Sequence, residues 1–411
     1  MTLSVCEAEA LSRSPLVIEK LESSYLRRPQ CWRDVTEDEW ASYDWQWQNR
    51  LMTADDIGRV TALSPDEIQA ISMSAGGFSA CISPHYASLI RSEEGSSCPI
   101  RRQCVPSMRE FETHDDLMTD PLGEYRHAVT SCSTRRYPDR VLIYSTHACA
   151  MRCRHCTRRG RVGMNETITR KSLEDAVECV LRDDRVRDVL ISGGDPLSLA
   201  NDDLRWLIET LKTCPHIDVV RVCTRMPCTL PQRMNDPELL SIFREFAPIY
   251  LNTQFNHPYE ATVESARALK TLREAGCILG NQSVLLRDVN DRGEIFEPLY
   301  RWLLREGCRP YYLFLCDVAQ GTEHFRTPIS SGLDIMRHLR GRLSGLGIPH
   351  FVVDLPDGYG KVDLCPANPT GDGERLVFRN WFGAEVEYRD AAAYEIAARG
   401  PSPPAKQLKT Q

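Results

Sequence analysis

The sequence lacks any apolar run long enough to cross a bilayer, and it has no excess of positive charge. Its 411 residues include 50 Lys and Arg against 57 Asp and Glu, which gives a net charge of -7. A membrane span needs about 20 predominantly apolar residues. A nucleic-acid surface needs clustered Lys and Arg. We therefore expect neither a membrane protein nor a nucleic-acid-binding protein.

The chain also lacks the features of an exported protein. Its start, MTLSVCEAEALSRSP, has neither the charged beginning nor the apolar core of a signal peptide. Seventeen cysteines are present, but they are spread along the chain without the close spacing of a small disulfide scaffold. This distribution favours a reducing compartment, so we expect a cytoplasmic protein.

Three cysteines end an apolar run in the segment VLIYSTHACAMRCRHCTRR. Cys149, Cys153 and Cys156 have C-x3-C-x2-C spacing. Three thiolates can bind three irons of a 4Fe-4S cube, which leaves the fourth iron open to bind and activate a small molecule. The spacing therefore predicts a catalytic iron-sulfur cluster.

Two other interpretations of the cysteines are a zinc site and ordinary core packing. Zinc would need a fourth ligand, which His147 or His155 could supply. The surroundings favour the cluster, because the cysteines follow a strand-like run and the turn SGGDP, at Ser192 to Pro196, follows the next one.

Strand-like and helix-like segments alternate from Val141 onward. Short apolar strands separated by amphipathic helices are typical of a parallel sheet with covered faces, which right-handed crossovers close toward a barrel. The predicted fold class is α/β, with a partial (β/α) barrel at residues 131–356, a mainly helical N-terminal extension at 1–130 and a small C-terminal extension at 357–411. The predicted strands are VLIYST, DVLISGG, VVRVCT, IYLNTQFN, ILGNQSVLL, PYYLFLCD and PHFVVD.

The N-terminal extension carries a clear helix start. In SPDEIQAIS, Ser64 is a predicted N-cap, Pro65 occupies the first helical position and Glu67 completes a capping box. Four tryptophans between residues 32 and 47 are expected to pack in a core. We expect this layer to cover the mouth of the barrel.

Polar residues directly follow every predicted strand. The active sites of such barrels form at the carboxyl ends of the strands, so these side chains should face one cavity. After the cysteines and SGGDP, they are Thr224 and Arg225, Asn252 to His257, Gln282, Asp317 and Asp354.

The motifs resemble, in order and in spacing, the lysine 2,3-aminomutase family of radical S-adenosylmethionine enzymes. The resemblance covers roughly Trp40 to Trp381, and SGGDPL, LPQRM, LNTQFNHP, LGNQSVLLRDVND, CDVAQGTEHFRTPISSG and HFVVDLPDGYGK carry it beside the cysteine motif. It implies a 4Fe-4S cluster, S-adenosylmethionine and pyridoxal 5'-phosphate as cofactors. It also implies an isomerase that moves an α-amino group from C2 to C3 and gives a β-amino acid.

The resemblance assigns cofactor contacts residue by residue. Lys361, in the glycine-containing loop DLPDGYGK, should carry the pyridoxal phosphate, and Arg136 and Arg140 should bind its phosphate. Otherwise Lys361 would be a solvated loop lysine and Arg140 a charge at a strand edge. The expected contacts to S-adenosylmethionine are Ser192, Gly193, Gly194, Asp195, Gln254 and Gln282.

The resemblance also indicates a basic substrate. Arg158 matches the arginine that clamps the substrate carboxylate, while Asp317 and Asp354 match the acids that hold the distal ammonium of lysine. Two ionised aspartates buried in an apolar barrel would be costly without a cation. The alternative is that each pairs with a protein arginine such as Arg326.

The chain departs from the lysine enzymes in ways that favour arginine. An added acid and added polar groups could serve a guanidinium, which has five donors where an ammonium has three. No Cys follows Cys365, so we expect no structural zinc site. The departures are Asp357 and Tyr359 in the lysine loop, Ala319, Gln320 and Thr322 after the first aspartate, and Gln254 in place of a histidine.

The expected partners are an amino acid substrate, an electron donor such as a flavodoxin or ferredoxin, and further copies in a homo-oligomer. Two alternatives stay open. One is an enzyme of the same family that acts on a protein lysine or works without pyridoxal phosphate. The other is a non-enzymatic zinc or iron-sulfur scaffold.

Overall fold

The computed structural model describes residues 17–18, 20–112, 114–163, 167–364, 370–371, 375–379 and 385–389. Most of the predicted C-terminal extension, including Cys365, lies outside these residues. No helix of the described segments has the length and apolarity of a membrane span. All fifteen cysteines within them are free thiols.

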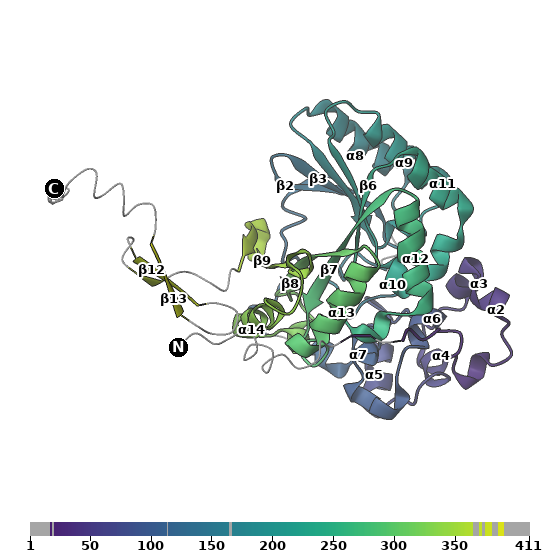
Figure 1. The fold of residues 1–411 in the computed structure, drawn as a ribbon. Coiled ribbons are helices and arrows are strands. Elements are labelled where there is room, and N and C mark those ends of the chain that lie inside the picture. The colour runs from purple at the N-terminus through teal and green to yellow at the C-terminus, as the bar shows by residue number, and fades with distance from the viewer. Residues whose placement is uncertain are drawn as a thin grey trace, which may run out of the picture.

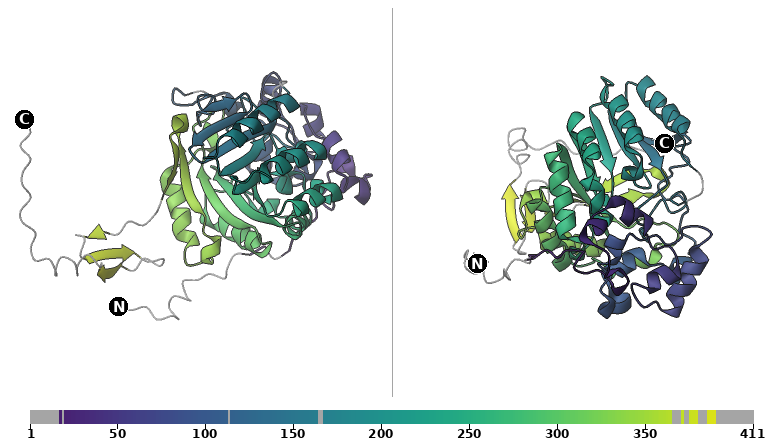
Figure 2. Two further views of the ribbon diagram at one scale, coloured as in Figure 1. Left: turned by 90° about the horizontal axis from the view of Figure 1, so that it is seen from above. Right: turned by 90° about the vertical axis from the view of Figure 1, so that its right-hand side faces the viewer.

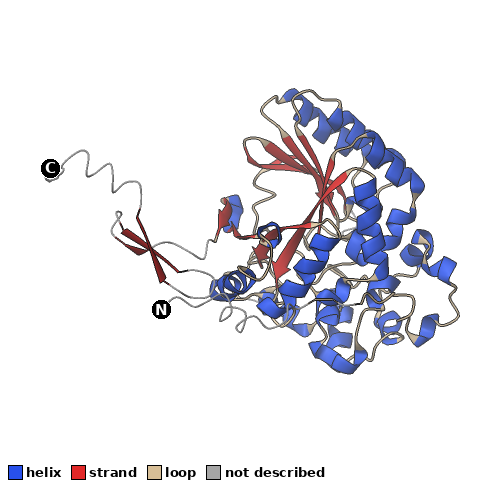
Figure 3. Cartoon of the chain, in the orientation of Figure 1, coloured by secondary structure: helices blue, strands red, loops and turns tan. Residues whose placement is uncertain are grey.

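A ten-stranded sheet forms the centre of the molecule, and its strands are ordered as they occur in the chain (Figures 1 and 3). The seven strands from β3 to β9 pair in parallel, and β1, β2 and β10 add antiparallel edges. The strands are β1 (Ala128–Thr130), β2 (Ser133–Tyr137), β3 (Arg140–Thr146), β4 (Asp188–Gly193), β5 (Val219–Cys223), β6 (Ile249–Thr253), β7 (Cys277–Leu285), β8 (Arg309–Leu315), β9 (His350–Leu355) and β10 (Gly360–Asp363).

The parallel strands are the seven that the sequence predicts, and the partial barrel is confirmed. The sheet curves with its helices on the outer side (Figure 2). Among the described strands, β1 and β10 do not pair, so the barrel stays open. The domain boundaries predicted at residues 130 and 356 remain predictions.

Amphipathic helices connect the parallel strands. In α9, for example, Leu204, Leu207 and Leu211 recur at helical spacing and are fully buried. The covering helices are α8 (Arg170–Arg182), α9 (Asn201–Lys212), α11 (Pro237–Glu245), α12 (Val263–Glu274), α13 (Gly293–Arg305) and α14 (Ile329–Leu339). Shorter turns between them are η4 (Pro196–Ser198), α10 (Met226–Thr229), η5 (Pro231–Asn235), η6 (Pro258–Glu260), η7 (Glu323–Phe325), η8 (Gly345–Gly347) and η9 (Pro356–Gly358).

Short helices of the N-terminal part gather at one end of the sheet (Figure 1). The predicted helix start is confirmed, since Ser64 caps α5 and forms a capping box with Glu67. The Trp32 and Trp40 side chains are buried. The elements are η1 (Gln30–Trp32), α2 (Glu37–Trp40), α3 (Tyr43–Gln48), α4 (Ala54–Gly58), α5 (Pro65–Ser74), α6 (Pro84–Ala87), η2 (Ser92–Ser97), α7 (Pro99–Cys104) and η3 (Met108–Phe111).

The segment that contains Lys361 forms a strand of the barrel sheet, whereas the sequence predicted a loop. Lys361 does not lie in a loop but in β10, where it is the direct cross-strand partner of Asp354 in β9. Farther along, β11 (Thr370–Gly371), β12 (Arg375–Arg379) and β13 (Glu385–Arg389) form a second, antiparallel sheet. Pairing with β9 makes the lysine part of the barrel wall.

Candidate active site

One cavity of about 360 Å³ collects the three motif cysteines and every residue to which the family resemblance assigned a cofactor or substrate contact. Most of these residues come from the later part of a parallel strand or the loop after it. The exceptions are Arg136 in β2, Arg140 at the amino end of β3 and Lys361 in β10. The fold therefore brings the predicted site together. What each residue binds remains a prediction.

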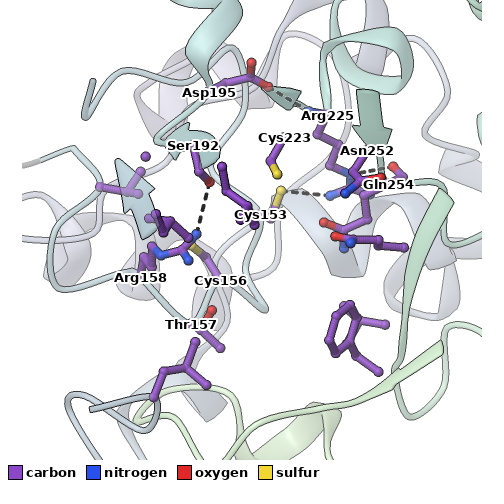
Figure 4. A pocket seen from close by; sticks show the side chains of 18 of the residues that line it. Cys153, Cys156, Thr157, Arg158, Ser192, Asp195, Cys223, Arg225, Asn252 and Gln254 are labelled. Atoms are coloured by element: carbon purple, nitrogen blue, oxygen red, sulfur yellow. Dashed lines mark hydrogen bonds between the residues drawn. The ribbon is translucent and has the colours of Figure 1, made fainter. Parts of the chain in front are cut away.

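The three motif cysteines follow β3 and line this cavity (Figure 4 labels Cys153 and Cys156). Burial, then the neighbouring Cys153 thiol, raises the pKa of Cys156 to about 11, so iron would have to displace a proton there. In the described part of the chain, no three Cys, His, Asp or Glu side chains converge on one metal ion. In a 4Fe-4S cube each of the three thiolates would bind a different iron.

Gly193 and Gly194 have a steric role that the sequence did not indicate. The Gly194 amide donates to the Thr146 carbonyl at 2.6 Å. A Cβ on Gly194 would lie 2.2 Å from the Ala148 oxygen, and Gly193 has φ of +129°. The two glycines thus let β4 pack directly against the start of the cysteine loop.

Asp195 is buried and accepts three hydrogen bonds from the protein. Its donors are Thr224 Oγ1 at 2.6 Å, the Arg225 amide at 2.8 Å and the Leu197 amide at 3.1 Å. Burial raises the pKa of this carboxyl above its ordinary value. Asp195 therefore ties the loop after β4 to the end of β5.

Gln254 and Gln282 lie on the same lining as the cysteines. Gln254 Nε2 lies 3.0 Å from Nε2 of His155, whose ring is fully buried. Burial, followed by the nearby Arg225, lowers the pKa of His155 well below its ordinary value, so the ring is neutral. A neutral imidazole next to the motif cysteines adds no charge to the site.

Arg158 lies in the cavity beside Ser192, whose Oγ accepts from Nη1 at 3.3 Å (Figure 4). A second partner, Glu124, has no motif and was missed from the sequence. Its carboxylate accepts from Nε at 2.9 Å and from Nη2 at 2.8 Å. Burial alone would raise the pKa of Glu124, but the Arg158 guanidinium lowers it below its ordinary value. Glu124 therefore stays ionised and fixes the guanidinium plane.

We expect Glu124→Gln to raise KM for the amino acid about tenfold and to change kcat much less, because the Arg158 fork loses its charged acceptor. Steady-state kinetics on the reconstituted enzyme would measure both constants, with Glu124→Asp as the charge-preserving comparison. A lower KM would show instead that Glu124 competes with the substrate carboxylate.

The acid pair and the lysine form one charged group. Lys361 Nζ donates to Asp354 Oδ2 at 2.7 Å, and Arg136 Nη1 lies 3.5 Å from Asp354 Oδ1. Asp317 Oδ1 is buried without a hydrogen-bond partner. Burial, followed by repulsion from Asp354, raises the pKa of Asp317 to about 7. Asp317 is thus a buried carboxyl group with an oxygen that no hydrogen-bond donor reaches.

Arg326 does not supply the cation that the alternative required. It pairs with Glu323 at 3.0 Å and with Asp116 at 3.4 Å. Asp354 does have cationic neighbours, but they are Arg136 and Lys361. Arg326 is therefore wrong as the named partner, but Asp354 does pair with a protein arginine, Arg136, at 3.5 Å.

Of the residues predicted to hold pyridoxal phosphate, Lys361 and Arg136 fit such a group. Burial lowers the pKa of Lys361 despite its ion pair, which favours the neutral amine that attacks a carbonyl. Nη1 of Arg136 is buried without a hydrogen-bond partner and could donate to a phosphate. Arg140 lies over the Tyr137 ring and bonds to Asp139, and its side chain is 40% exposed.

Most of the departures from the lysine enzymes lie away from the cavity. Asp357 and Gln320 are exposed, and Tyr359 is 78% exposed. Only Gln254 of this group belongs to the cavity lining. The position of Asp357 gives no support to its predicted contact with a guanidinium.

Comparisons with known proteins agree with the geometry. Residues 143–299 match the model of the radical SAM superfamily, and residues 336–406 match the model described as lysine-2,3-aminomutase. The L-lysine 2,3-aminomutase of Fusobacterium nucleatum is 39% identical over 88% of this chain and 85% of its own length. That of Clostridium subterminale is 38% identical over 90% and 88%, and the glutamate 2,3-aminomutase of Clostridioides difficile is 38% identical over 88% and 85%.

Among solved structures, HydG, a maturase of the [FeFe]-hydrogenase, has a TM-score of 0.36 and 12% identity, and the match covers 73% of this chain and 66% of that one. The three cysteines on a partial barrel and the superfamily match define a radical S-adenosylmethionine enzyme. The chain belongs to the lysine 2,3-aminomutase family and is an amino acid 2,3-aminomutase, an isomerase. The family brings a 4Fe-4S cluster and S-adenosylmethionine, and its lysine enzymes add pyridoxal phosphate.

Proposed function

We propose that the enzyme uses pyridoxal phosphate to move the α-amino group of a basic L-amino acid from C2 to C3. The observation that supports this best is Asp317, whose Oδ1 is buried without a hydrogen-bond donor. It shares one cavity with Asp354, Arg158 and Lys361. A buried carboxylate of this kind is stabilised by a ligand cation. The sequence departures favour L-arginine over L-lysine, but Gln254 is the one departure among them that lines the cavity.

The residues of the chain provide positioning. The cluster and S-adenosylmethionine supply one-electron chemistry when bound, and pyridoxal phosphate supplies electron delocalisation. Arg158 would hold the substrate carboxylate while Asp317 and Asp354 hold the distal cation. With both ends fixed, C2 and C3 have one orientation toward the reacting groups.

We infer that the cluster receives its electron from a flavodoxin or a ferredoxin, that the enzyme forms a homo-oligomer and that it acts in the cytoplasm.

Turnover assays with different amino acids test directly which of them is the substrate. The enzyme would be purified anaerobically, reconstituted with iron, sulfide and pyridoxal phosphate, and supplied with S-adenosylmethionine and dithionite. L-Arginine, L-lysine and L-glutamate would be compared by mass spectrometry of the β-amino products. We expect conversion of a basic amino acid, and conversion of glutamate alone would overturn the proposal.

We expect pyridoxal phosphate to be attached to Lys361. Borohydride reduction and peptide mapping should place the pyridoxyl group on that residue, and Lys361→Ala should lose the absorbance at about 420 nm that bound cofactor gives. A pyridoxyl group found on another lysine would contradict the assignment.

A further inference from the structure

The guanidinium of Arg225 lies directly on a cluster cysteine. Arg225 follows β5, and its amide is fixed by Asp195 at 2.8 Å. Its Nη1 donates to Cys153 Sγ at 2.8 Å (Figure 4). The side chain is 8% exposed, so water does not screen this contact fully. No motif marks the arginine, which the sequence shows only as a polar residue after a strand.

A buried acid holds the other side of this guanidinium. Glu260, in η6, is fully buried and accepts from Arg225 Nη2 at 2.8 Å. The same nitrogen donates to Gln103 Oε1 at 2.8 Å. Glu260 also accepts from Tyr86 Oη at 2.7 Å and from the His257 amide at 2.9 Å. Tyr86 and Gln103 come from the N-terminal helices, so that layer helps to fix the charge next to Cys153.

This geometry has a defined electrostatic effect on anything that Cys153 binds. Reduction adds negative charge to an iron-sulfur cluster, and hydrogen bonds to its sulfurs and nearby net charge set its potential. Arginine is always protonated, so its charge is constant over the working pH range. The cation on Cys153 stabilises the reduced cluster, and the carboxylate behind it opposes that effect from a greater distance.

We propose that Arg225 and Glu260 are a charge pair that sets the reduction potential of the cluster. Arg225 raises the potential and Glu260 limits the rise, and neither residue touches the substrate in this assignment. The proposal rests on the assignment of the cluster to Cys149, Cys153 and Cys156.

Redox titration followed by electron paramagnetic resonance, on anaerobically reconstituted enzyme without S-adenosylmethionine, tests the pair. Arg225→Gln should lower the equilibrium constant for one-electron reduction about tenfold, which is about 59 mV. Glu260→Gln should shift the potential in the opposite direction by a smaller amount. Arg225→Lys should stay nearer to the wild type, because it retains the charge.

Arg233→Gln is the matched control. Arg233 is also buried and ion-paired, but its partners are Asp236, Asn201 and the Leu197 carbonyl. Its replacement should leave the potential unchanged.

The outcomes distinguish a failure of the charge pair from a failure of the cluster assignment. Wild-type enzyme without iron and sulfide would refute the cluster assignment itself. With the cluster present, an unchanged potential in Arg225→Gln, or shifts of one sign in Arg225→Gln and Glu260→Gln, would overturn the charge pair. Loss of the cluster from both Arg225→Gln and Arg225→Lys would also overturn it, because the arginine would then only hold the cysteine loop in place.

Discussion

Replacing Cys149, Cys153 and Cys156 together by alanine is expected to leave the purified enzyme without bound iron and sulfide and without aminomutase activity. The three side chains line one cavity after β3, and each would bind a different iron. Without them no thiolate of the motif remains to hold the cube, so the loss should be complete.

The measurement is iron and sulfide content after anaerobic reconstitution, together with visible absorbance. Cys223→Ala is the matched control, because Cys223 lines the same cavity from the end of β5 but lies outside the motif. It should retain the cluster. Full iron content in the triple variant would place the cluster elsewhere and refute the assignment.

Replacing Asp317 by Asn should lower kcat/KM for the basic substrate by a factor of tens to thousands. Removing one partner of a buried charge pair costs on the order of 2 to 5 kcal/mol. Cluster content and pyridoxal loading should not change, since Asp317 contacts neither the cysteines nor Lys361 through a hydrogen bond found among the described residues. Normal turnover in this variant would show that the acid is structural.

Asp354→Asn should reduce turnover as strongly as Asp317→Asn, and it should also change the protonation of Lys361. Asp354 bonds to Lys361 at 2.7 Å, so its neutral replacement also removes the partner of the cofactor lysine. Lys361 should then lose its proton at lower pH. Comparing the pH dependence of pyridoxal attachment in the two Asn variants would separate substrate binding from this second effect.

The raised pKa of Asp317 adds a pH test to the same prediction. Its pKa rises from 3.8 to about 7 on folding, so the folded protein binds the proton more tightly than the unfolded chain. Stability of the free enzyme should therefore fall as pH rises through that range. Asp317→Asn should unfold on the order of 2 to 5 °C above the wild type at about pH 8, and the two should coincide near pH 4.

Substrate binding should show the opposite trend. A cationic substrate needs ionised Asp317, so KM should fall about tenfold between about pH 6 and about pH 8 in the wild type. The Asn variant should show no such fall. A flat profile in both proteins would mean that Asp317 does not hold the substrate cation.

The sequence by itself determined the features that depend on local order. Cysteine spacing predicted the cluster loop, and apolar runs between amphipathic helices identified all seven parallel strands. Because these strands run parallel, their carboxyl ends meet at one edge of the sheet, so residues as distant as Gln254 and Asp317 could be assigned to one cavity.

Only the tertiary structure decided which side chains pair within that cavity. Glu124 and Arg158 are 34 positions apart, Arg225 and Cys153 are 72 apart, and Tyr86 and Glu260 are 174 apart. Lys361 faces Asp354 because β10 folds back on β9 in one register, which the glycines of the turn allow but do not specify. Such contacts have no periodic signal, since they depend on how loops from separate elements pack when the whole barrel forms.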